Sequence, residues 1–187
     1  MKVKDIVVTA LKILGRNLLA EKLVEGGDLD AGERDTVNTL VHCFNAVEDE
    51  VARSYIPLCA EQVLHSYYGE FSFALFEHTP VRITAVKAGG EEIDYKIFPE
   101  YLKADAERVS VEYDYAPAVK DIDGVSEFNC AVGAYLFACG AAAEYCLING
   151  EIQAAEIWES KYRQEIERVQ KSRTVSSGGY IPPRRWV

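Results

Sequence analysis

Few residues of this chain have types and spacings that suit catalysis or metal binding. The three histidines are His42, His65 and His78, and none of the five cysteines forms a C-x-x-C pair. His42 adjoins Cys43, but neighbouring residues on a helix point in different directions, so one metal ion would not readily take both. We therefore expect no metal site and a structural role for His42.

The acidic stretch DLDAGERD, residues 28–35, begins like a calcium-binding loop. An EF-hand loop needs glycine at its sixth position and glutamate at its twelfth, but counting from Asp28 gives Glu33 and Thr39. Asp30 does precede Glu33 by three residues, as in a capping box. The stretch is therefore interpreted as a turn followed by a helix cap.

Motifs for phosphate binding or an activated nucleophile are also absent from the sequence, which contains neither G-x-x-x-x-G-K-[ST] nor G-x-S-x-G. Cys139 and Cys146 lie seven residues apart on one helical face, where thiols usually fill core space. Four tyrosines fall in strand-like segments and are expected to pack on a sheet: Tyr95, Tyr101, Tyr113 and Tyr115. We predict no catalytic, cofactor-binding or metal-binding residue, no cofactor, and no enzyme.

The composition indicates a globular protein with an acidic surface. The chain has 187 residues, of which 49% are hydrophobic, enough to bury one real core. Its formal net charge of −10 argues against a protein whose main function is to bind nucleic acid, because Lys and Arg dominate phosphate binding. The odd number of cysteines, without paired spacing, indicates reduced and mostly buried thiols in a cytosolic compartment.

No segment is expected to enter a membrane or to direct secretion. Asp5, Lys12 and Arg16 interrupt the apolar N-terminal stretch, so we interpret it as an amphipathic helix and not as a signal peptide. The longest uncharged run, FNCAVGAYLFACGAAA, is shorter than the roughly 18–20 residues that span a bilayer, and we expect a buried helix there.

Helical periodicity predicts two N-terminal helices. The first covers residues 3–23 with one apolar stripe and ends at Gly26-Gly27. The second follows the Asp30 cap and runs to about Tyr55, after which Pro57 either kinks it or begins a short continuation through Leu64. Six residues form its apolar stripe: Val37, Leu40, Val41, Phe44, Val47 and Val51.

Between residues 70 and 116 the pattern changes to short alternating segments rich in β-branched and aromatic residues, EFSFALF, VRITAVKA, EIDYKIF and RVSVEYDYAP. The intervening AGGEE is a turn signal. We predict a small antiparallel sheet.

Helical periodicity returns from about Val125, and Asn149-Gly150 divides this part into two helices of an antiparallel hairpin. Glycines 133 and 140, with four nearby alanines, leave little side-chain bulk around the first of them. Since each glycine costs about 1 kcal/mol in a helix relative to alanine, we expect close packing around a central helix.

The last seventeen residues differ in charge from the rest. Residues 171–187 contain four basic residues and no acid. The preceding 170 residues therefore have a formal charge of −14, against −10 for the whole chain. Residues 176–179 are expected to form a flexible joint, and Pro182-Pro183 favours an extended backbone. Our hypothesis is that this arm binds an acidic, groove-bearing partner protein through five residues: Tyr180, Ile181, Arg184, Arg185 and Trp186. The alternative is a frayed terminus, or one that folds back on the acidic body of its own chain.

The sequence thus predicts an α+β fold: mainly a helical bundle, with an inserted small antiparallel β-sheet and an extended C-terminal tail. Residues 1–173 are expected to form a single helical domain with its β insertion at about 70–116, and residues 174–187 an extended arm.

The order of these elements, with EYCLINGEIQAAEIWESKYRQEIERV and the basic tail, resembles the head-to-tail connector (neck adaptor) proteins of tailed bacteriophages. In that family a glycine-bounded turn leads into a helix with Ala, Trp and Tyr on its inner face. Here the matching residues are Asn149, Gly150, Ala154, Ala155, Trp158 and Tyr162. The likeness is closer to tail tubular and adaptor proteins that carry a β insertion than to the purely helical members.

The resemblance implies a structural protein of the virion neck, assembled in the bacterial cytoplasm. It implies a ring, commonly of twelve copies, that binds the portal protein and a tail or stopper protein and lets DNA pass without specific binding. It also implies a C-terminal segment that docks on the portal or on a neighbouring subunit. An acidic body suits such a channel, because it does not hold a sliding polyanion.

The sequence is also consistent with two other functions. A bacterial cytosolic adaptor would use the helical hairpin as a partner surface and would be a stable monomer or dimer. An enzyme with an unrecognised site would use Tyr and Glu residues of the β segment.

Overall fold

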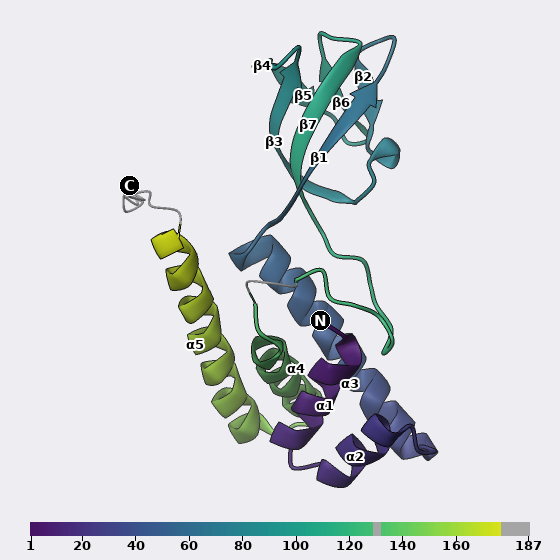
Figure 1. Cartoon of the computed structure of the whole chain (residues 1–187), viewed down its shortest axis with the longest axis vertical. Coiled ribbons are helices and arrows are strands. Elements are labelled where there is room, and N and C mark those ends of the chain that lie inside the picture. The colour runs from purple at the N-terminus through teal and green to yellow at the C-terminus, as the bar shows by residue number, and fades with distance from the viewer. Residues whose placement is uncertain (129–131, 177–187) are drawn as a thin grey trace. The chain divides into compact units, whose positions relative to one another are not determined.

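The computed structural model describes residues 1–128 and 132–176 and forms two compact units (Figure 1). We call Met1–Glu48 with the chain from Val119 onward the helical unit, and Asp49–Ala118 the β unit. The structure is 50% helical and 23% strand. The predicted α+β fold is therefore confirmed, whereas the predominance of a helical bundle is not.

The first predicted helix is two helices. Helix α1, Val3–Ile13, ends before Gly15, whose φ of +75° lies in the left-handed region that favours glycine, and α2 covers Asn17–Glu25. The break turns Leu18 away from the predicted apolar stripe, and 78% of its surface is exposed. Gly26, also with positive φ, ends α2 as predicted.

Helix α3, Ala31–Glu50, begins with the predicted capping box. The Glu33 amide donates to Asp30 Oδ1 at 2.8 Å, and the Asp30 amide donates to Glu33 Oε2 at 3.0 Å. Two of the amides at this end are thereby satisfied. All six residues of the predicted stripe are buried: Val37, Leu40, Val41, Phe44, Val47 and Val51.

A π-helical turn, Val51–Tyr55, follows α3, and the predicted helical continuation through Leu64 is wrong. Residues Leu58–His65 instead form strand β1, which pairs antiparallel with β7, Arg108–Tyr115, at all eight positions. This long-range pairing outweighs the helix preference of the local sequence, and it starts the sheet region twelve residues earlier than predicted.

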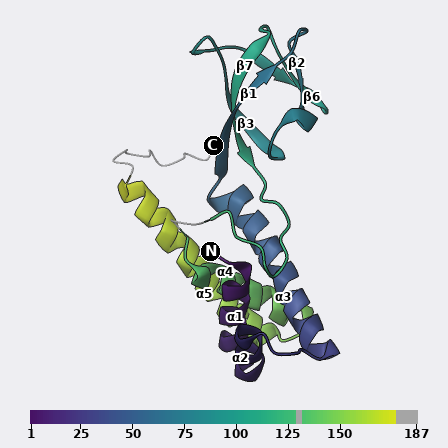
Figure 2. The same cartoon turned by 45° about the vertical axis from the view of Figure 1, so that its right-hand side comes forward.

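The last two helices form the predicted hairpin. Helices α4, Ala134–Ile148, and α5, Ile152–Ser176, lie side by side in both views (Figure 1 and Figure 2). Gly150, with φ +75°, lies in the turn between them. Helix α4 begins nine residues after the predicted Val125, because Val125 forms a β-bridge with Lys2 and the residues up to Phe128 are not helical.

Helix α4 is the central helix of its unit, as predicted. Ten of its fifteen residues are buried, and the helix packs on α1 and α5. It also contacts α3, where the rings of Phe137 and Phe44 pack edge to face with centroids 5.7 Å apart. A Cβ added at Gly140 would lie 2.7 Å from a methyl carbon of Val47 on α3 and 3.1 Å from the ring of Tyr162 on α5. The lack of a side chain at Gly140 therefore allows three helices to pack closely together. No helix of the described residues is both long and apolar enough to cross a membrane.

Replacing Gly140 with alanine is expected to lower the free energy of unfolding by up to about 2 kcal/mol. Alanine favours a helix by about 1 kcal/mol over glycine, but overpacking a core costs about 1–3 kcal/mol. Urea unfolding measures the change. The control is Gly140→Ala combined with Val47→Ala, which removes the clashing methyl groups. This pair should lose less than the sum of the single losses, whereas additive losses would contradict the steric account.

The β unit contains two antiparallel sheets in place of the single one predicted. One has the order β1-β7-β3-β4 and the other β2-β6-β5. Their remaining strands are β2 Glu70–Ser72, β3 Pro80–Ala88, β4 Glu91–Glu92, β5 Tyr95–Ile97 and β6 Tyr101–Ala104. The predicted AGGEE turn joins β3 to β4, and Gly89 and Gly90 both have positive φ. A 3₁₀ turn, Phe73–Leu75, ends the predicted first strand after Ser72.

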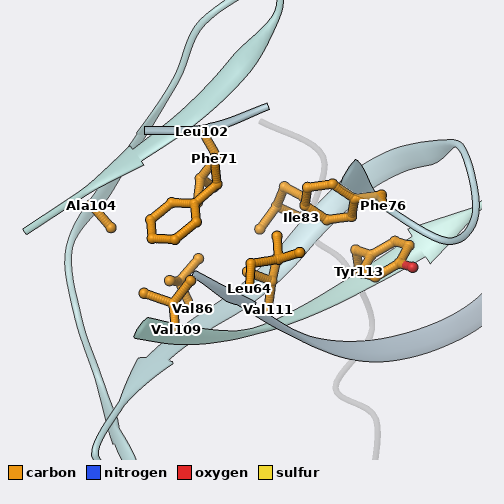
Figure 3. Packing of buried hydrophobic residues seen from close by; sticks show 10 residues of the cluster. All are labelled: Leu64, Phe71, Phe76, Ile83, Val86, Leu102, Ala104, Val109, Val111 and Tyr113. Carbon is orange, nitrogen blue, oxygen red and sulfur yellow. The ribbon is translucent and has the colours of Figure 1, made fainter. Parts of the chain in front are cut away.

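The two sheets enclose a core of their own. Phe71, Leu102 and Ala104 of the smaller sheet face Val86, Val109 and Val111 of the larger one (Figure 3). Phe76 packs edge to face on Tyr113, with centroids 4.8 Å apart. The four predicted sheet tyrosines all lie in strands. The β unit therefore has a continuous apolar interior of its own, which holds its two sheets together.

Candidate partner-binding surface

The five residues predicted to bind a partner, Tyr180, Ile181, Arg184, Arg185 and Trp186, lie outside the described residues. Helix α5 continues through Ser176, so the segment predicted as an arm from residue 174 begins with helical residues. Within the described residues, the candidate sites are polar clusters, thiols and surface hollows.

One buried polar cluster combines a serine, a lysine and two carboxylates in the helical unit. Glu48 is fully buried, and its Oε1 accepts a hydrogen bond from the Ser126 hydroxyl at 2.6 Å and another from the Glu127 amide at 3.1 Å. Lys120 Nζ lies 2.9 Å from Glu48 Oε2, as an ion pair and not as an aligned hydrogen bond, and 3.2 Å from Glu127 Oε1.

This cluster holds the chain where it returns to the helical unit. The Asn45 side chain donates to the Lys120 carbonyl and accepts from the Lys120 amide, both at 2.8 Å. The Ser126 hydroxyl lies next to a carboxylate, as in a nucleophile activated by a base. Ser126 is only 3% exposed and Glu48 is 0% exposed, however, so a substrate has no access to either. The arrangement is suited to anchoring the segment from residue 119 to residue 128.

The thiols have contrasting environments. Cys43, Cys139 and Cys146 are buried as predicted, whereas Cys59 is exposed and donates to Asp114 Oδ1 at 3.3 Å. Cys130 lies outside the described residues. His42 is exposed and its neighbour Cys43 is buried, so the two point apart as expected. The described residues hold no group of three or more His, Cys, Asp and Glu side chains able to bind a metal ion.

Alkylation at pH 8 is expected to modify the exposed Cys59 faster than the buried Cys43, which should stay unmodified. Burial, with a smaller contribution from the charge of Glu144, raises the pKa of the Cys43 thiol from 9.0 to about 11. Because this folded-state pKa lies above the unfolded value, Cys43 contributes stability that is complete below pH 9 and declines as pH rises towards 11.

Peptide mass mapping after timed exposure to iodoacetamide measures both rates. In the Cys59→Ser control, Cys43 should stay protected until the chain is unfolded in urea. Equal labelling of Cys43 and Cys59 in the native protein would contradict the burial seen here.

The β unit carries an apolar groove that could receive a partner. It has a volume of about 420 Å³ and is lined by Phe73, residues 79–83 and Ile97, and we call it the β3 groove. Val81 is 41% exposed and Ile97 58% exposed, so apolar side chains face solvent there. Arg82 donates to Asp114 Oδ2 from Nε at 2.9 Å and from Nη2 at 2.5 Å, an ion pair that neutralises the charge at one wall.

A second exposed feature is the loop between β1 and β2. Tyr67 and Tyr68 are 89% and 87% exposed at its tip. The Ser66 hydroxyl accepts hydrogen bonds from the amides of Tyr68 and Glu70, and the Gly69 carbonyl accepts one from the Ala104 amide at 2.9 Å. The loop therefore presents two aromatic rings on an ordered backbone.

The charge of the β unit bears on what either surface would bind. Residues 49–118 contain thirteen Asp and Glu against six Lys and Arg, a formal charge of −7. A cationic partner is therefore favoured over an anionic one.

Comparison with protein-family models and with curated protein sequences gives no match.

Sequence reasoning did not find the β3 groove. Its lining residues come from three separate segments, and no spacing along the chain links Phe73 or Ile97 to β3. The one available signal was the exposed apolar side of the alternating segment VRITAVKA.

Proposed function

We propose that this protein is a structural subunit of a tailed-phage or prophage head-to-tail connector. It forms a ring below the portal protein, contacts a tail or stopper protein on its other side, and lines the passage through which DNA moves in the virion neck. Its role is mechanical and involves no catalysis.

The observation that carries the proposal is the order of the elements. The β unit is inserted between α3 and the α4–α5 hairpin, and within the hairpin the inner face of α5 carries Ala155 and Tyr162, both buried against neighbouring helices. This is the order of elements on which the resemblance to adaptors with a β insertion rests.

Charge and surface chemistry also support the proposal. A chain of net charge −10 lets a polyanion slide past without holding it. A ring needs heterologous contacts that close on themselves. The exposed apolar residues at the hairpin turn, Leu147, Ile148 and Ile152, and those of the β3 groove supply surface for such contacts.

Native mass spectrometry of the chain with the portal protein encoded by the same genome tests the proposal. We expect a complex that contains a ring of this chain, commonly twelve copies, on one portal. A variant lacking residues 177–187 is expected to assemble less well on the portal, and unchanged assembly would contradict a docking role for the arm. A chain that stays monomeric or dimeric beside the portal would contradict the connector function and favour a cytosolic adaptor.

A further inference from the structure

The β3 groove runs along an incompletely paired strand edge. Strand β4 pairs with β3 only at Lys87 and Ala88. From Pro80 to Ala85, β3 therefore has β7 on one side and no strand of the described residues on the other. The Ile83 carbonyl on this edge accepts a long hydrogen bond, 3.4 Å, from the Tyr95 hydroxyl of β5. Such an edge offers backbone groups to which an extended chain can pair.

The groove beside this edge has apolar walls and a surplus of negative charge nearby. Covering Ile97 and Val81 is favourable, because each Å² of apolar surface removed from water contributes about 25 cal/mol to the free energy of binding. Glu77 is exposed two residues before Thr79. Glu100 is also exposed, and its carbonyl accepts the Phe73 amide at 3.0 Å, so its backbone adjoins the groove. The surface thus suits an extended segment with apolar and cationic side chains.

The chain itself contains a segment of this chemistry. Residues 177–187 read SGGYIPPRRWV, with three large apolar residues, two arginines and no acid. Pro182-Pro183 restricts the backbone to extended conformations. Eleven residues at about 3 Å each reach roughly 33 Å, longer than the groove requires, since a strand of six residues spans about 20 Å.

We propose that residues 180–186 of one copy occupy the β3 groove of a second copy, so that neighbouring subunits are joined arm to groove. The proposal rests on the connector function and names its subunit contact. A second copy is favoured as the partner because copies of charge −10 repel one another, and a cationic arm set against a β unit of −7 offsets part of this repulsion. A contact between two different patches is also the kind that closes a ring.

The first experiment measures arm binding to the full-length chain. A fluorescent peptide of residues 177–187 is titrated into a chain whose own arm carries Ile181→Ser and Trp186→Ser, at low salt. We expect saturable binding that weakens as salt is added, and at least tenfold weaker binding when the chain also carries Ile97→Lys. Val63→Lys is the matched control, because Val63 is 47% exposed on β1 outside the groove and makes the same change of charge.

A peptide of the same composition in scrambled order should not bind. Ile97→Ala serves as a second groove variant without added charge, and it should weaken binding less than Ile97→Lys but more than Val63→Lys. Equal affinity for the Ile97→Lys and Val63→Lys chains would overturn the proposal.

The second experiment asks whether the contact joins two copies. Full-length Ile97→Lys, with an intact arm, is mixed with the full-length arm variant, which has an intact groove. Each alone should sediment as a monomer, and the mixture should form a 1:1 dimer. A monomeric mixture beside strong peptide binding would show that an arm attached to its own chain does not reach the groove of a second copy, which overturns the proposal.

The outcome for the connector function is separate. If Ile97→Lys assembles on the portal as the wild type does, the arm-to-groove contact is wrong and the connector function stands. If both arm experiments give the expected results but the wild type does not bind the portal, the connector function is wrong and the contact between copies stands.

Discussion

Replacing Lys120 with methionine is expected to lower the free energy of unfolding of the helical unit by about 3–5 kcal/mol. The change removes the ammonium group 2.9 Å from Glu48 Oε2 and leaves a fully buried carboxylate without its counter-ion. The same ammonium lies 3.2 Å from Glu127 Oε1, so a second carboxylate is affected. Urea unfolding, with hydrogen exchange to locate the loss in α3 and in residues 119–128, measures the effect.

The matched control is Lys22→Met, which breaks an ion pair to Glu33 at 2.6 Å in the same unit. Both partners of that pair keep contact with solvent, so the loss should be a small fraction of that for Lys120. Adding Glu48→Gln to Lys120→Met should recover part of the stability, because a neutral amide does not need a counter-ion. Equal losses for the two lysine variants would contradict an anchoring role for the buried cluster.

Local patterns predicted those elements whose formation depends on nearby residues. The Asp30–Glu33 cap, the buried stripe of α3 and the turn at Gly150 all follow from spacings of three to eight residues, and each is present in the structure. The central place of α4 followed from its glycine and alanine content, and the 2.7 Å approach at Gly140 supplies the physical reason. In these cases local sequence and packing favour the same conformation.

Elements that depend on distant partners were missed. Residues 58–65 contain Leu, Ala, Glu and Gln, which favour helices, yet they form β1 because β7, more than forty residues later, offers a partner at every position. Strand β6 was not among the four predicted segments, although Tyr101 was expected to lie on a strand, because Tyr101–Ala104 is short and lies between two partners, β2 and β5. The break at Gly15 was missed because the apolar spacing continues through it.

The candidate surfaces were unpredictable for a related reason. The buried cluster joins Glu48 to Lys120 and Ser126, residues more than seventy positions apart, and nothing in the local sequence marks Glu48 as buried. The β3 groove likewise depends on how the two sheets pack and on where β4 stops pairing with β3. By contrast, the chemistry of the basic C-terminal segment was evident from composition alone.

Replacing Gly69 with alanine is expected to destabilise the β unit by about 2–5 kcal/mol. A Cβ at this position would lie 2.2 Å from the Ala104 carbonyl oxygen, a backbone atom that cannot move without disturbing the pairing of β2 with β6. The φ of +66° adds a cost of about 1–2 kcal/mol for any residue with a side chain, and relieving the overlap adds about 1–3 kcal/mol.

Gly89→Ala separates these two causes. Gly89 has a similar φ of +62°, but a Cβ there would meet nothing within 4 Å, so this variant should lose only the conformational cost. The difference between the two variants in urea unfolding therefore measures the clash with Ala104. If Gly69→Ala loses no more than Gly89→Ala, the loop is able to shift away from β6, and Tyr67 and Tyr68 would not be held on an ordered backbone. A larger loss at Gly69, with faster hydrogen exchange confined to β2 and β6, is the result that the close contact requires.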